Sequence, residues 1–177
     1  TVIASQIVVA LQTIASRRAD PVEQVVVSIT SFETSSTAFN VIPQEVKIKG
    51  TVRTLDPDVR VLAEKEFLRI TELTAEAMGG SADAKFTRGY PVMSNSNAQT
   101  EFAAKVARDV AGECAEAPLV MGGEDFAYML EERPGAYILL GNGDSSPVHH
   151  PKYNFNDDAI PFGCSWLVEL VEQKMPV

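Results

Sequence analysis

The chain has 177 residues, 45% of them hydrophobic, and a formal net charge of −9. This length and composition allow one large core or two small ones. The negative charge argues against nucleic acids and anionic membrane surfaces as partners, because both would repel the protein. No apolar run in the sequence approaches the roughly 20 residues of a membrane-spanning helix, and we expect a cytoplasmic protein.

The first half of the chain predicts a mixed α/β unit. Apolar residues recur at three- and four-residue spacing over residues 1–16, which predicts a helix with one buried face. Residues 25–32 are rich in β-branched side chains and residues 46–53 alternate between apolar and polar ones, so we expect two neighbouring strands. Residues 82–88 are predicted to form a third strand.

A second helix is expected between the second and third strands. Asp56 is a typical helix cap, and Pro57 suits the first helical position. The glycine pair at 79–80 is a stop signal. The expected buried face of this helix consists of Val59, Ala63, Phe67, Ile70, Leu73 and Ala77.

The resulting order, α-β-β-α-β, is that of a ferredoxin-like βαββαβ unit without its first strand. A sheet that lacks this strand would leave a gap or an unpaired edge. We therefore expect residues before Thr1 to supply the strand. The first domain is placed at residues 1–92.

The second half predicts helices over residues 97–111, from about residue 124, and over residues 157–173, with one strand at 136–140. A single strand among three helices cannot satisfy its own backbone groups. Residues 93–177 are therefore expected to be the remainder of an α/β layer whose other strands lie outside the chain.

The two histidines of the chain, His149 and His150, stand side by side in a loop between Pro147 and Pro151. Proton transfer near neutral pH, or metal binding by imidazole, would have to use this pair. Two solvated loop histidines are the plainer interpretation, because a loop His without partners at a known spacing is a weak metal signal.

Other polar residues could carry chemistry, although each has an ordinary structural explanation. Glu124 and Asp125 follow two glycines at a helix start, where acids complement the helix dipole. Asn40 begins a turn between strands, and Arg53 ends a strand on its polar face. Asp157-Asp158 opens the last helix, where capping explains the acids better than a catalytic dyad does.

Four motifs, taken in order, resemble one enzyme family. They are Asn-Val-Ile-Pro at 40–43, Gly-Thr-Val-Arg-Thr at 50–54, Met-Gly-Gly-Glu-Asp-Phe at 121–126, and Val-His-His-Pro at 148–151 with Phe-Asn-Asp-Asp-Ala-Ile-Pro-Phe-Gly at 155–163. They resemble the metal-dependent aminoacylase and carboxypeptidase family, especially its hippurate hydrolases, N-acyl-amino-acid amidohydrolases and auxin-conjugate hydrolases. The resemblance implies a ferredoxin-like lid that mediates dimerisation, followed by the C-terminal part of an α/β metallohydrolase domain.

The resemblance also implies roles for single residues. His149 matches a metal-ligand histidine that completes a site for two divalent ions, such as zinc, manganese or cobalt. Asn40 and Arg53 match lid residues that reach the substrate's α-carboxylate, often across a dimer. Gly123 matches a loop that passes close to the substrate. The residues with an expected supporting role beside the site are Glu124, Asp125 and His150.

The implied function is cleavage of the amide bond of N-acyl amino acids or small peptides by a homodimer. In the family that these motifs resemble, the other metal ligands and the catalytic glutamate would lie before Thr1. We therefore expect no catalytic residue within this chain, and an inactive chain on its own.

Two other functions stay open from the sequence. A non-enzymatic dimerisation or regulatory module derived from that family would leave the histidine loop idle. An RNA-binding ferredoxin-like domain would need a basic sheet face with stacking aromatics. Lys47, Lys49 and Arg53 supply some positive charge, but the strands carry few aromatics and the net charge opposes this function.

Overall fold

The computed structural model describes residues 1–175 and divides into two compact units. The first consists of Thr1–Val92 together with Met121–Gly123. The second consists of Met93–Val120 together with the described residues from Glu124 onward. The chain thus returns briefly to the first unit at the glycine pair before helix α4 (Phe126–Glu132), a detour that the sequence did not predict.

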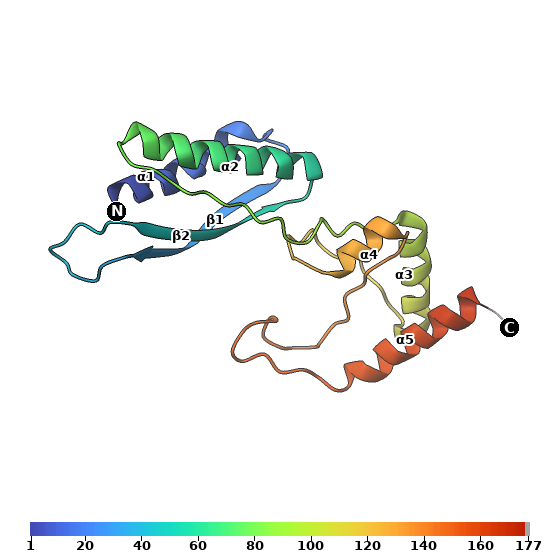
Figure 1. Cartoon of the computed structure of the whole chain (residues 1–177). Helices are drawn as coiled ribbons and strands as arrows, with labels where there is room; N and C mark the ends of the chain where they lie inside the picture. Colours follow the sequence, from blue (N-terminus) through green and yellow to red (C-terminus); the bar gives the residue numbers. More distant parts are fainter. Residues whose placement is uncertain (176–177) are drawn as a thin grey trace. The chain divides into compact units, whose positions relative to one another are not determined.

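An antiparallel hairpin forms the sheet of the first unit (Figure 1). Strands β1 (Val25–Thr34) and β2 (Val46–Thr54) both match the sequence prediction. The register shifts by one residue between Ile29 and Ser31, which is a β-bulge opposite Gly50. A Cβ atom on Gly50 would lie 2.3 Å from the Ser28 carbonyl oxygen, so this position accepts glycine only.

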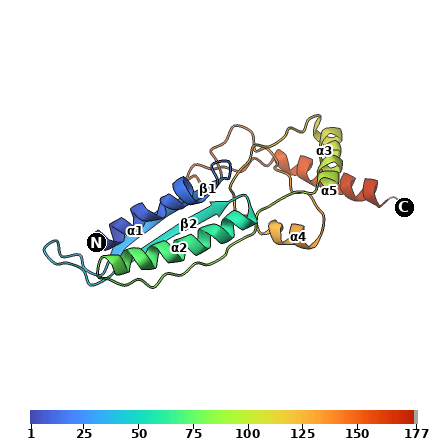
Figure 2. The same ribbon diagram turned by 90° about the horizontal axis from the view of Figure 1, so that it is seen from above.

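Two helices lie side by side along one face of the hairpin (Figure 2). They are α1 (Val2–Leu11), which continues into the π-helical turn η1 (Ile14–Arg18), and α2 (Pro57–Ala77). The apolar stripe predicted for residues 1–16 faces inward. The core cluster of this unit consists of Ile7, Leu11, Ile14, Val27, Ala63, Ile70 and Ala75.

Helix α2 begins and ends where the sequence predicts. The Asp56 carboxylate accepts hydrogen bonds from the backbone N–H groups of Asp58 at 2.7 Å and Val59 at 3.0 Å. After the helix, Gly79 adopts a positive φ of 76°, and the Gly80 N–H donates to the Ala75 carbonyl at 2.9 Å.

The predicted buried face of α2 is wrong toward its C-terminal end. Leu73 and Ala77 are exposed, whereas Thr71 and Ala75 are buried. The chain after Gly80 packs Ala82 against the core of this unit.

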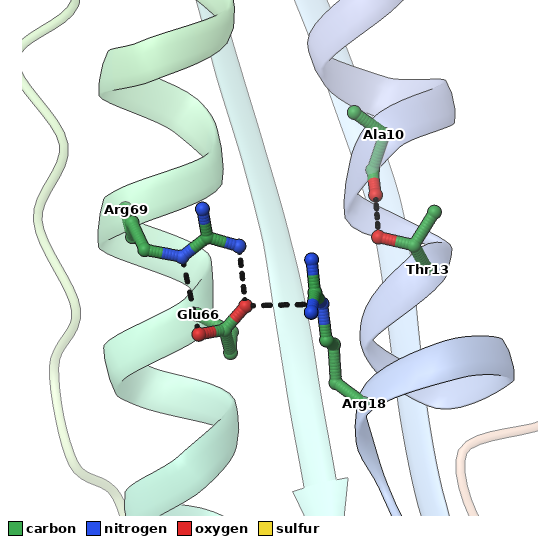
Figure 3. Close-up of polar contacts among 5 residues, drawn as sticks. All are labelled: Ala10, Thr13, Arg18, Glu66 and Arg69. Atoms are coloured by element: carbon green, nitrogen blue, oxygen red, sulfur yellow. Dashed lines mark hydrogen bonds and ion pairs between the residues drawn. The ribbon is translucent and has the colours of Figure 1, made fainter.

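A buried carboxylate ties the two helices together (Figure 3). Glu66, 9% exposed on α2, binds the Arg69 guanidinium at 2.6 Å and also pairs with Arg18 of η1 at 3.4 Å. The hydrogen bond from Arg69, helped by the two positive charges, lowers the pKa of Glu66 although burial opposes this shift. The Glu66 carboxylate therefore stays ionised at neutral pH.

The predicted third strand at residues 82–88 is absent. Within residues 1–175, β1 and β2 make up the sheet. A strand needs a neighbour for its backbone groups, and this extended segment packs through side chains instead. The ring of Phe86 meets Phe67 edge-on at 5.7 Å between centroids. The α-β-β-α part of the predicted order is confirmed, and the ferredoxin-like completion stays a prediction.

Three helices make up the regular structure described in the second unit. They are α3 (Asn97–Ala111), α4 (Phe126–Glu132) and α5 (Ala159–Lys174), close to the predicted ranges. The Trp166 indole N–H donates to the Ala103 carbonyl at 3.1 Å and joins α5 to α3. The prediction that the Asp157 and Asp158 side chains cap α5 is wrong. The side-chain oxygen of Asn156 instead accepts a hydrogen bond from the Asp158 N–H at 3.0 Å.

The strand predicted at residues 136–140 is also absent. The Asn95 side chain takes the place of a neighbouring strand, because its amide donates to the Tyr137 carbonyl and accepts from the Tyr137 N–H, both at 2.8 Å. A side-chain amide can satisfy the backbone groups of one residue in this way, but it cannot replace the row of hydrogen bonds that a neighbouring strand provides.

In the described chain, no helix combines the length and the apolar character needed to cross a membrane.

Candidate functional site

The histidine loop holds an exposed and locally unusual residue. His149 has a positive φ of 69°, the left-handed region that residues other than glycine rarely adopt. Such conformations cost about 1 kcal/mol or more and are concentrated at functional sites. Two backbone turns fix the loop. The His150 N–H donates to the Pro147 carbonyl at 3.1 Å, and the Tyr153 N–H donates to the His150 carbonyl at 2.9 Å.

The two imidazoles differ in their partners. Nδ1 of His150 accepts a hydrogen bond from the backbone N–H of Lys152 at 3.1 Å. This bond favours the tautomer with the proton on Nε2, and neither nitrogen of that ring is then a ready metal ligand. The local geometry thus uses His150 to shape the turn, and it favours His149 for a ligand role.

Asn40 lies in the loop that joins β1 to β2. The loop around it is apolar and open, with Phe39 fully exposed and Ile42 90% exposed.

Arg53 stands at the other end of the hairpin. It pairs with Val26 in the ladder, whereas the loop that carries Asn40 follows the pair of Thr34 with Val46. Seven residue steps separate Val46 from Arg53, so the two ends are about 24 Å apart at the usual rise of about 3.4 Å per residue. One hairpin cannot bring Asn40 and Arg53 to the same small group.

The Arg53 guanidinium donates to the backbone carbonyl of Met121. This contact holds the detour of residues 121–123 on the first unit, so Arg53 and Gly123 are brought to one neighbourhood. A Cβ atom on Gly123 would lie 3.2 Å from the Tyr90 ring, which gives a packing reason for glycine there. The sequence motif did not indicate that Arg53 has a backbone partner.

Glu124 has defined partners in the second unit. Its Oε2 accepts from the Tyr137 hydroxyl at 3.0 Å and its Oε1 from the Asp125 N–H at 3.1 Å. The Tyr137 hydrogen bond is the main cause that lowers the pKa of Glu124, and the same bond raises the pKa of Tyr137. Asp125 itself is exposed at the start of α4 and makes no side-chain cap bond.

Sequence reasoning missed Tyr137 and Asn95, which lie 42 positions apart. Neither belongs to a charged or cysteine-containing motif, so no local signal marks them. A metal centre is likewise not assembled by the described residues, because no group of three His, Cys, Asp or Glu side chains among residues 1–175 is placed to hold an ion.

Comparison with known proteins gives a consistent result. The profile of peptidase family M20/M25/M40 matches residues 4–173. An N-acetyl-L-cysteine deacetylase from Bacillus subtilis is 36% identical over 172 residues, which cover 97% of this chain and 41% of that protein. A hippurate hydrolase from Campylobacter jejuni is 36% identical over 173 residues, covering 94% of this chain and 44% of its own length.

A solved structure agrees in fold. It is a dinuclear metal-binding M20 peptidase from Bacillus subtilis, with a TM-score of 0.77 and 28% identity. The match covers 96% of this chain and 44% of that one. The chain therefore spans less than half the length of the relatives it matches.

Proposed function

Because the chain belongs to peptidase family M20/M25/M40, we propose that it is part of a dinuclear metal-dependent amidohydrolase. The enzyme cleaves the amide bond of N-acyl amino acids or small peptides. The family match over residues 4–173 carries this proposal. Support for the substrate class comes from relatives named for N-acetyl-L-cysteine, N-acetyldiaminopimelate and hippurate.

His149 is the proposed metal ligand of this chain. Its imidazole suits zinc, manganese or cobalt, its loop is exposed, and its left-handed backbone marks a constrained position. Two bound divalent ions supply Lewis-acid activation of the amide carbonyl and of water. One histidine is not a complete ligand set, so the proposal leaves the other ligands and the catalytic glutamate to residues outside those described. The 177-residue chain alone is accordingly proposed to be inactive.

Arg53 and Asn40 are the proposed anchors of the substrate's α-carboxylate. A guanidinium fork gives charge-assisted hydrogen bonds to a carboxylate, and Asn40 adds an amide donor. The separation of about 24 Å along the hairpin, at about 3.4 Å per residue, exceeds the reach of both side chains together. If both residues touch one carboxylate, they come from two copies of the chain, and this geometry supports a homodimer formed through the lid.

The anchoring role of Arg53 is tested with Arg53→Ala in the protein at its natural length. The kcat/KM for an N-acyl amino acid should fall at least about tenfold more than the kcat/KM for its carboxamide, because only the acid loses a charge-assisted bond. Lys49→Ala is the matched control, since it removes an exposed cation from the same strand.

Equal losses on the acid and the carboxamide would reject the anchoring role. They would show instead that Arg53 acts through the Met121 carbonyl, by holding the detour that carries Gly123.

A further inference from the structure

A chain of hydrogen bonds in the second unit ends at Glu124. The Tyr137 hydroxyl donates to Glu124 Oε2 at 3.0 Å, and the Tyr137 ring packs against Phe126 with 5.6 Å between centroids. Tyrosine brings a hydroxyl on a rigid ring with two torsions, so a fixed ring gives a fixed hydroxyl.

The backbone of Tyr137 is fixed as well. Asn95 clamps both of its peptide groups at 2.8 Å, and the Ser96 N–H donates to the Gly135 carbonyl at 2.9 Å. Asn95 and Ser96 immediately precede α3, whose Val106 is fully buried. The clamp therefore connects Glu124 to a packed helix and not to a free loop.

This arrangement leaves Glu124 half-buried and able to accept further bonds. A carboxylate offers about four acceptor positions. The Tyr137 hydroxyl and the Asp125 N–H use two of them, and the backbone N–H of Phe126 also hydrogen-bonds to this carboxylate. The ionisable groups that influence it are Tyr137 from the extended segment and Asp125 from its own turn.

We propose that Tyr137, clamped by Asn95, is a positioning residue that holds the Glu124 carboxylate in one orientation for the amide-hydrolysing site. This inference rests on the proposed function. Tyr137 acts through Glu124 and does not itself touch the substrate.

The test uses Tyr137→Phe and Glu124→Gln, singly and together, in the protein at its natural length. Tyr137→Phe should lower kcat/KM for an N-acetyl amino acid about tenfold, the size expected for a lost hydrogen bond to a charged group. In the Glu124→Gln variant, adding Tyr137→Phe should lower kcat/KM by less than about twofold.

The pH profile gives a reading that a packing defect would not produce. Loss of the hydroxyl raises the pKa of Glu124, so the acid limb of kcat/KM should move to higher pH in Tyr137→Phe. Equal losses in both backgrounds with an unmoved acid limb would overturn the proposal.

A second measurement separates this inference from the proposed function. If the protein hydrolyses no N-acyl amino acid, the proposed function fails, and titration of the ¹³C-labelled Glu124 carboxyl by NMR decides the positioning claim alone. A higher pKa in Tyr137→Phe than in the wild type upholds it, and an identical pKa refutes it.

Discussion

The two units bury their apolar residues to very different degrees. In the first, seven residues from α1, η1, β1 and α2 form one contiguous core cluster. Among the described residues of the second, the buried apolar ones are Ala103, Val106, Ala127 and Ala159, while α5 exposes Leu167, Val168 and Val171 by more than half. Burial of apolar area is the main source of stability. The first unit should therefore be the more stable of the two in this chain.

The largest contrast should come from matched leucine truncations. Leu11 is 1% exposed in the first core and Leu167 is 58% exposed on α5. Leu11→Ala should cost about 3 kcal/mol because it leaves a cavity, whereas Leu167→Ala should change stability by less than about 0.5 kcal/mol. Urea unfolding followed by circular dichroism measures both variants.

The single tryptophan sharpens this comparison. Trp166 lies on α5, so its fluorescence reports on the second unit alone. Leu11→Ala should shift the circular dichroism transition and leave the fluorescence transition in place. One shared shift would show that the two units unfold together.

An intermediate effect is expected at the ion pair between the helices. Glu66→Gln should cost about 2 kcal/mol, because it leaves two guanidinium groups without their buried partner. Glu64→Gln, which breaks the more exposed pair with Arg88, should cost less than about 1 kcal/mol. Equal losses of stability in Glu66→Gln and Glu64→Gln would contradict the claim that burial makes the Glu66 ion pairs the more important ones.

The Glu66 effect also depends on pH. The pKa of Glu66 is lowered in the folded protein, mainly by the Arg69 hydrogen bond, from its ordinary value of 4.5. The stabilisation is therefore complete above that value and is lost as the pH falls through the lowered pKa. The difference in the free energy of unfolding between the wild type and Glu66→Gln should therefore become smaller at acidic pH.

The smallest effect concerns helix caps. Asp56→Ala should cost about 1 kcal/mol, because two backbone N–H groups of α2 lose their acceptor. Ser96→Ala at the start of α3 should cost only a few tenths of a kcal/mol, about the level of an ordinary surface substitution, since that side chain makes no cap bond. A reversed order would show that α3 governs stability more than α2.

Much of the fold was predictable because the deciding signals are local. The Asp56-Pro57 start of α2 and the alternating side chains of β2 depend on neighbours in sequence. The strands predicted at 82–88 and 136–140 failed for the opposite reason, because a strand exists only through its partner. Phe67 packs against the ring of Phe86 and Asn95 hydrogen-bonds to the backbone of Tyr137, both from distant positions, and no local pattern marks either contact.

The candidate site divides in the same way. The motifs identified the family through Arg53, His149 and their neighbours, as the family match bears out. The Met121 carbonyl that binds Arg53 and the Tyr137 hydroxyl that binds Glu124 lie 68 and 13 positions away from their partners, so these contacts depend on tertiary packing. The roles of Asn40, Arg53, Gly123 and His149 stay predictions.

Metal content and activity of His149→Ala, in the protein at its natural length, test the central claim most directly. His150→Asn is the control, because asparagine retains an acceptor for the turn at Lys152. The account predicts that His149→Ala loses bound metal and nearly all hydrolysis of N-acyl amino acids, while His150→Asn retains both. Full metal content and activity in His149→Ala would contradict it and favour a dimerisation or regulatory module with an idle histidine loop.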